Sequence, residues 1–120
     1  MAMTSSSSLA ATQAKHWYWQ RISAMVLALC VLLHLGVIIY AVRSGLSAAA
    51  ILGRTHGSLL FGGFYVIFVL ACAVHVPIGL GRIAEEWLGC STRAAQIGAR
   101  LFGLLILFMG LRAVYGVVLA

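Results

Sequence analysis

The sequence predicts an all-α membrane protein with three transmembrane helices, for two reasons. Of the 120 residues, 63% are hydrophobic and only 8% are charged, whereas soluble domains average about 25% charged residues. The hydrophobic residues also concentrate in three long runs, each near the ~20 residues that a helix needs to cross a bilayer. Because lipid offers no water to the backbone, each run is expected to be helical. A soluble monomer and a disordered chain are both excluded.

The three predicted spans are Ile22–Val42, Leu59–Leu80 and Ile97–Leu119. Residues 15–120 are therefore expected to form one three-span membrane domain, joined by short charged loops at 43–58 and 81–96. Residues 1–14 carry no charge and include a run of serines, which predicts a disordered tail. This tail lacks the basic start and the long apolar core of a signal peptide.

Basic residues flank the spans unevenly, and this asymmetry predicts the orientation. The side with the N-terminus and the second loop carries Lys15, Arg21, Arg82 and Arg93, against Arg43 and Arg54 on the other side. Since positive residues favour the cytoplasmic side, the N-terminus is expected in the cytoplasm and the C-terminus in the periplasm, across a bacterial inner membrane. The basic residues are scattered singly, whereas nucleic-acid binding needs them clustered on a wet face, so no nucleic-acid partner is expected.

Acid–base catalysis has few candidate residues in this chain. Asp and Asn are absent, and the only carboxylate side chains are those of Glu85 and Glu86, outside the predicted spans. A proton-coupled exporter would need an acidic side chain within the membrane, and the position of both glutamates outside the spans argues against that class of protein. The three cysteines, Cys30, Cys72 and Cys90, show no metal-ligand spacing, so neither a disulfide nor an iron–sulfur site is expected.

His75 is the main candidate for a functional residue, because an ionisable side chain within lipid is costly. Ala71 and Gly79 lie one turn before and one turn after it, and these small residues predict a trough around the imidazole that a flat macrocycle could enter. Small-residue faces also allow close helix packing, with the histidine bonded across the interface. The local pattern leaves haem binding and helix packing open. Pro77 removes an amide and predicts a kink at this level.

A second histidine, His34, lies within the first span but at a different depth. It follows Arg21 by thirteen residues, whereas His75 precedes Arg82 by seven. The two histidines are therefore about 10 Å apart in depth and poorly placed to ligate one metal from opposite sides. An interhelical hydrogen bond is the preferred interpretation of His34.

Two segments resemble the cytochrome b membrane-anchor subunit (C subunit) of succinate dehydrogenase. The family's first span opens with a His-Arg-hydrophobic-Ser-Gly pattern, and here the segment is Gln20-Arg21-Ile22-Ser23-Ala24. The family's second span has a haem-ligand histidine, a glycine four residues on, a basic residue and an acidic-aromatic pair. His75, Gly79, Arg82 and Glu86-Trp87 stand at those spacings. The resemblance covers the chain from about Trp17 onward, although Gln20 and Ala24 depart from the first pattern.

The resemblance implies a function and a set of partners. The chain would be the membrane anchor subunit of a succinate:quinone oxidoreductase, a non-catalytic electron-transfer subunit. His75 would be the axial ligand to the iron of haem b. Arg21 and Ser23 would lie near the bound quinone, which would be ubiquinone or menaquinone, or near a haem propionate. A second membrane anchor subunit would supply the other haem ligand and complete a larger helical bundle. The iron–sulfur subunit would dock on the inner face and connect the chain indirectly to the flavoprotein subunit.

One alternative belongs to a different class. A cofactor-free, three-span structural or assembly subunit of a membrane complex would show the same composition and the same spans. Such a subunit would purify without haem and would bind no quinone.

Overall fold

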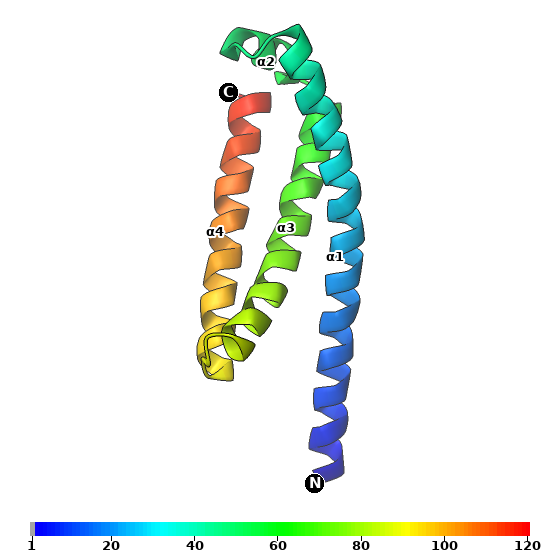
Figure 1. Ribbon diagram of the computed structural model, residues 1–120, viewed down its shortest axis with the longest axis vertical. Coiled ribbons are helices and arrows are strands. Elements are labelled where there is room, and N and C mark those ends of the chain that lie inside the picture. The colour runs from blue at the N-terminus through cyan, green and yellow to red at the C-terminus, as the bar shows by residue number, and fades with distance from the viewer. Residues whose placement is uncertain (1) are drawn as a thin grey trace.

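The protein is a bundle of three long helices with one short helix at one end (Figure 1). The computed structural model describes residues 2–120, with side chains from Ser5 onward. The helices are α1 (Ala2–Ser44), α2 (Ala48–Thr55), α3 (Leu59–Glu86) and α4 (Thr92–Val118). We call the end that holds α2 and the C-terminus the α2 end, and the opposite end, where residues 87–91 join α3 to α4, the turn end.

The helices α1, α3 and α4 are each long and apolar enough to cross a membrane. The prediction of an all-α protein with three candidate spans is therefore confirmed. Helix α4 ends at Val118, one residue before the predicted end of the third span, and Leu119 caps it. Large apolar side chains cover the outside of all three helices, as expected for surfaces that face lipid.

A disordered tail was predicted at residues 1–14, whereas residues 2–14 are helical in the structure. Helix α1 begins at Ala2 and runs without a break into the first span. Residues 2–14 contain neither Gly nor Pro, and extending an existing helix avoids the cost of nucleating a new one. Ser8 and Thr12 also donate hydrogen bonds to the carbonyls of Ser5 and Ser8, at 2.9 and 3.0 Å. As Figure 1 shows, this part of α1 projects beyond the other helices.

The first loop contains the short helix α2, which hydropathy alone did not reveal. Ser47 caps its N-terminus, with the hydroxyl oxygen 3.1 Å from the amide of Ala50. The guanidinium of Arg54 then ties α2 to the end of α1. It donates to the carbonyl of Gly45 at 2.8 Å and lies over the ring of Tyr40, 5.4 Å from the centroid. A serine followed by three alanines was the available sequence signal for this helix.

Helix α2 also secures the C-terminal end of α4. The Thr55 hydroxyl, in a side chain that is only 6% exposed, donates to the carbonyl of Val117 at 2.7 Å. Next to it, the amide of Gly57 donates to the carbonyl of Val118, also at 2.7 Å. Gly57 has a φ of 73°, a conformation that favours glycine. These bonds satisfy carbonyls at the end of α4 that have no partner within the helix.

Close contacts between small and branched residues hold α3 against α4. A Cβ atom on Gly103 would overlap the Cγ of Pro77, and one on Gly110 would lie 2.6 Å from a Cγ of Val69. Helix α3 continues through Pro77, so the proline ring packs directly onto α4 without interrupting the helix. Glycines at such positions let two helix backbones approach closely in lipid.

Helix α1 packs on α3 through a stripe of residues spaced three or four apart. The stripe consists of Gln20, Ser23, Leu27, Cys30, His34, Val37 and Ala41, all buried or partly buried. It contains three polar side chains of the first span, whereas Met25, Leu29 and Leu32 on the other side are highly exposed. This helix therefore turns polar groups toward its neighbour and apolar groups toward lipid, the arrangement expected of a membrane span.

Candidate functional site

The two segments that resemble the anchor-subunit family meet where α1 crosses α3. The Oγ of Ser23 on α1 lies 3.3 Å from the Nδ1 of His75 on α3. Ser23 is only 4% exposed, while His75 is partly buried. The fold thus joins two of the three predicted site residues, which are 52 positions apart in the chain.

Ser23 Oγ lies between two polar partners. It is 3.1 Å from the carbonyl of Gln20, within its own helix, and 3.3 Å from His75 Nδ1. Because a hydroxyl has one hydrogen and two lone pairs, it can donate to the Gln20 carbonyl and accept from Nδ1–H. In that arrangement the lone pair of the imidazole is on Nε2, which is the tautomer that binds a metal through Nε2.

Gln20 fills part of the trough that was expected around His75. Its Nε2 would lie 3.2 Å from a Cβ atom on Gly79, so the absence of a side chain there makes room for this amide. The trough is therefore closed on its Gly79 side by α1. The Oε1 of Gln20 is buried and has no hydrogen-bond partner among the described residues. A buried carbonyl without a partner typically costs about 1–3 kcal/mol, so this amide is held by packing.

Arg21, the third predicted site residue, is not part of this contact. It is exposed, and its guanidinium lies over the ring of Trp17, 5.5 Å from the centroid. Ser23 faces α3 two residues further on, so the two side chains leave α1 in different directions. The structure brings Ser23 to His75 and leaves Arg21 free to meet a ligand or another chain.

His75 is the side chain of this contact that could ligate a haem iron, with its Nδ1 3.3 Å from Ser23 Oγ. Among the described residues, no group of three or more His, Cys, Asp or Glu side chains gathers as a metal site.

His34 does not make the interhelical hydrogen bond that was expected of it. Its Nδ1 is buried and has no hydrogen-bond partner among the described residues. The ring instead packs edge-on against Tyr65 and Phe68, with centroids 5.8 and 5.7 Å apart. The partners available on α3 at this level are aromatic, and the sequence alone did not show that His34 would face them.

Two cavities lie on either side of the Ser23–His75 contact along the bundle. The cavity near the α2 end has a volume of about 610 Å³ and is lined mostly by apolar residues of all four helices, including His34 and Tyr65. The cavity near the turn end has a volume of about 490 Å³ and is lined by His16, Arg82, Glu85, Glu86 and Arg100, among others. At this end of the bundle α3 leans away from α1 (Figure 1).

The fold and site define a three-span membrane protein with one histidine held between two of its helices. Comparisons with protein-family models, with curated protein sequences and with solved structures find no match to this chain. Sequence reasoning missed the packing of Gln20 on Gly79 and the cavity beside His34. The available sequence signal was the spacing of Gln20, Ser23 and His34, which places the three side chains on one face of a helix.

Proposed function

We propose that this chain is the haem-binding membrane anchor subunit of a succinate:quinone oxidoreductase. The observation that carries the proposal is the contact between Ser23 Oγ and His75 Nδ1, at 3.3 Å. It connects the two segments that resemble the anchor family, and it gives His75 Nδ1 an oxygen partner, which supports iron binding through Nε2. The subunit itself performs no dicarboxylate chemistry.

His75 is the residue proposed to hold haem b, through its Nε2. When bound, haem supplies one-electron transfer, and its potential depends on the axial ligand and its hydrogen bonds. Ser23 orients the His75 ring. Because His75 remains partly exposed, a second membrane anchor subunit can approach it and supply the other axial ligand.

Arg21 is the residue proposed to contact the quinone, ubiquinone or menaquinone. Its guanidinium is exposed beside Trp17, so it can donate to a carbonyl oxygen of the ring. The Ser23 hydroxyl is already engaged with Gln20 and His75, and its role is therefore to position the histidine. The quinone would lie on the side of α1 that carries Arg21.

The turn end is the surface proposed for docking of the iron–sulfur subunit, through which the flavoprotein subunit would deliver electrons. Arg82 and Glu86 are exposed one turn apart on α3, and Trp87 is 82% exposed. A large aromatic residue between charges is typical of surfaces that bind a protein partner. With the orientation predicted from the basic residues, this end lies on the cytoplasmic side of a bacterial inner membrane.

Reduced-minus-oxidised spectra test the proposal. The complex is purified from native membranes through a tag on this chain, and the b-type haem signal is compared with that of the His75→Ala variant. We expect the signal to disappear in His75→Ala and to persist in His56→Ala, a control that removes an exposed histidine at the end of α2.

Two results would overturn the assignment in different ways. A normal haem signal in His75→Ala would remove the ligand role. A wild-type complex that purifies without haem and without flavoprotein and iron–sulfur subunits would instead support the cofactor-free structural subunit.

A further inference from the structure

The cavity near the α2 end has walls suited to a lipid-soluble molecule. Its volume is about 610 Å³, within the usual range of small-molecule sites, ~300–1,000 Å³. Side chains such as Ile51, Val69, Ile106 and Val114 line it, and no charged residue does. A ligand with a charged head group would leave its charge unpaired here, which is very costly in an apolar site.

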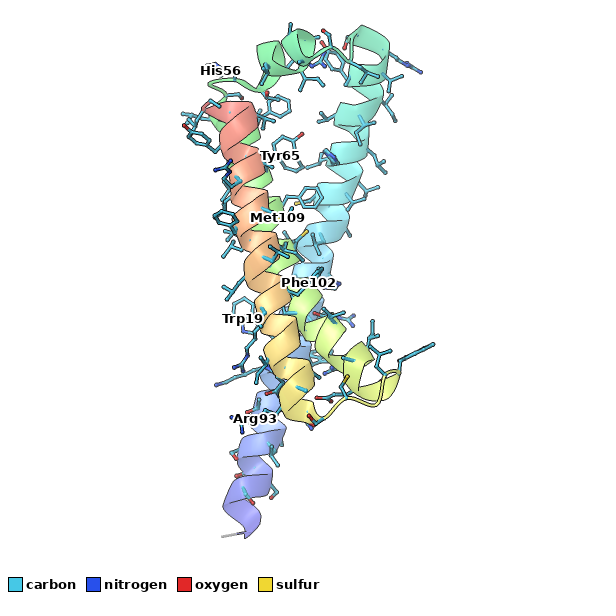
Figure 2. All side chains as sticks on the ribbon, turned by 90° about the vertical axis from the view of Figure 1, so that its left-hand side faces the viewer. Trp19, His56, Tyr65, Arg93, Phe102 and Met109 are labelled. Atoms are coloured by element: carbon cyan, nitrogen blue, oxygen red, sulfur yellow. The ribbon has the colours of Figure 1, made fainter. Side chains whose placement is uncertain are left out.

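Two polar side chains on the cavity wall have no hydrogen-bond partner among the described residues. His34 on α1 and Tyr65 on α3 both line the cavity, and their rings meet edge-on with centroids 5.8 Å apart. Figure 2 shows Tyr65 in the space between α1 and the paired helices α3 and α4. The other hydroxyl on the wall, that of Thr55, already donates to a carbonyl of α4.

The burial of His34 Nδ1 indicates what kind of group would satisfy this histidine. An unpartnered acceptor is tolerated more readily in a protein interior than an unpartnered N–H. The buried Nδ1 is therefore best left as the acceptor, which places the proton on Nε2. This N–H then needs an oxygen acceptor, and the Tyr65 hydroxyl can either donate or accept. A hydroxyl group meets both requirements, because it donates one hydrogen bond and accepts two.

We propose that this cavity binds an uncharged lipid-soluble molecule with a hydroxyl head group, which hydrogen-bonds to His34 and Tyr65 while its apolar body lies along α4. The site is separate from the proposed haem ligand. His34 lies eleven residues beyond Ser23 on α1, which is about 16 Å along the helix. The inference therefore stands whether or not His75 binds haem.

Photolabelling of the full chain in native membranes tests the proposal with two probes. One is hexadecanol carrying a diazirine in its chain, and the other is the same diazirine hydrocarbon without the hydroxyl. Labelling of the α4 peptide that contains Ala113 is normalised to labelling of the lipid-facing side of α1 at Leu32. We expect the alcohol to label the cavity peptide roughly 5-fold more than the hydrocarbon, the factor that corresponds to one hydrogen bond of about 1 kcal/mol.

Two variants with matched controls separate head-group recognition from cavity shape. His34→Phe should reduce the preference for the alcohol, since only the Tyr65 hydroxyl remains to bind the head group. It should keep the hydrocarbon labelling, which also shows that the cavity persists; His56→Phe should change neither. Ala113→Phe adds a ring to the cavity wall and should reduce labelling by both probes. Ala28→Phe, on an exposed position of α1 that does not line the cavity, should leave both unchanged.

Equal labelling by the two probes would overturn the proposal, because the cavity would then hold only lipid chains. Absence of labelling at the α4 peptide by either probe would also overturn it, since a helix of another chain would then cover the cavity.

Discussion

Ser23 and His75 lie 3.3 Å apart, and the hydrogen of the Ser23 hydroxyl is donated to the Gln20 carbonyl, away from His75. When that hydrogen is directed to Gln20, the Ser23 hydroxyl accepts from His75 Nδ1–H, and the lone pair of the imidazole is on Nε2. An oxygen that accepts from Nδ1–H increases electron donation from Nε2. This relationship leads to the first prediction.

With His75 as the proposed haem ligand, Ser23→Ala should weaken haem binding without abolishing it. The His75 ring would lose the hydroxyl that orients it. Haem retention should therefore fall on the order of 10-fold, which is the lower end of the usual effect of removing a hydrogen-bond partner of a ligating histidine. The haem midpoint potential should rise, because a less electron-donating imidazole stabilises the oxidised iron less. A redox titration of the purified complex measures both effects. Ser23→Thr keeps the hydroxyl and should retain the wild-type potential; an identical potential in Ser23→Ala would contradict the assigned role.

Gln20→Met should stabilise the chain. The Gln20 Oε1 is buried without a partner, and removing such a group while keeping similar shape recovers part of its desolvation cost, about 1–3 kcal/mol. The measurement is the Tm of the purified chain in detergent, which should increase. Gln96→Met is the control because Gln96 is exposed, and its Tm should not change. A lower Tm in Gln20→Met would show that the amide makes an interaction that the packing does not reveal.

Gly103→Ala should destabilise the contact between α3 and α4. The added Cβ would overlap the Pro77 ring, and a proline ring cannot rotate away. Overpacking of this kind costs about 1–3 kcal/mol. Gly98→Ala on the same helix is the matched control, because a Cβ there has no atom within 4 Å. Thermal unfolding should therefore separate the two variants, and equal Tm values would argue against this helix contact.

Thr55→Val should loosen the end of α4. The substitution keeps the shape of the side chain and removes the hydroxyl that donates to the Val117 carbonyl at 2.7 Å. Loss of one such bond, which leaves a carbonyl without its partner, costs about 1–3 kcal/mol. Hydrogen exchange of the amides in the last turns of α4 should accelerate. Thr55→Ser retains the hydroxyl and should exchange more slowly than Thr55→Val.

The hydropathy of the sequence was sufficient to predict the three spans, because the cost of exposing a backbone to lipid leaves few alternatives. It could not predict α2, since eight residues are too few to span a membrane. It also missed the helical N-terminal segment, because the serine-rich composition resembles a disordered chain and the continuity with α1 is not visible in composition.

The sequence indicated the candidate residues Ser23 and His75, but it did not predict the contact between them. His75 and Ser23 were both identified, but which faces of α1 and α3 meet depends on how each helix is rotated about its axis. That rotation is decided by side-chain packing between distant segments, such as Gln20 on Gly79. Arg21 and Ser23 were expected at the same site. The structure shows that their side chains leave α1 in different directions.

The polar stripe of α1 has a consequence for how the protein is made. Helix α1 leaves the ribosome first, so it enters the membrane before α3 has been synthesised. During that interval the side chains of Gln20, Ser23 and His34 have no protein surface to cover them, and only the arrival of α3 removes them from lipid. Membrane insertion of this protein therefore includes an interval in which the first span is held in the bilayer by its apolar side alone.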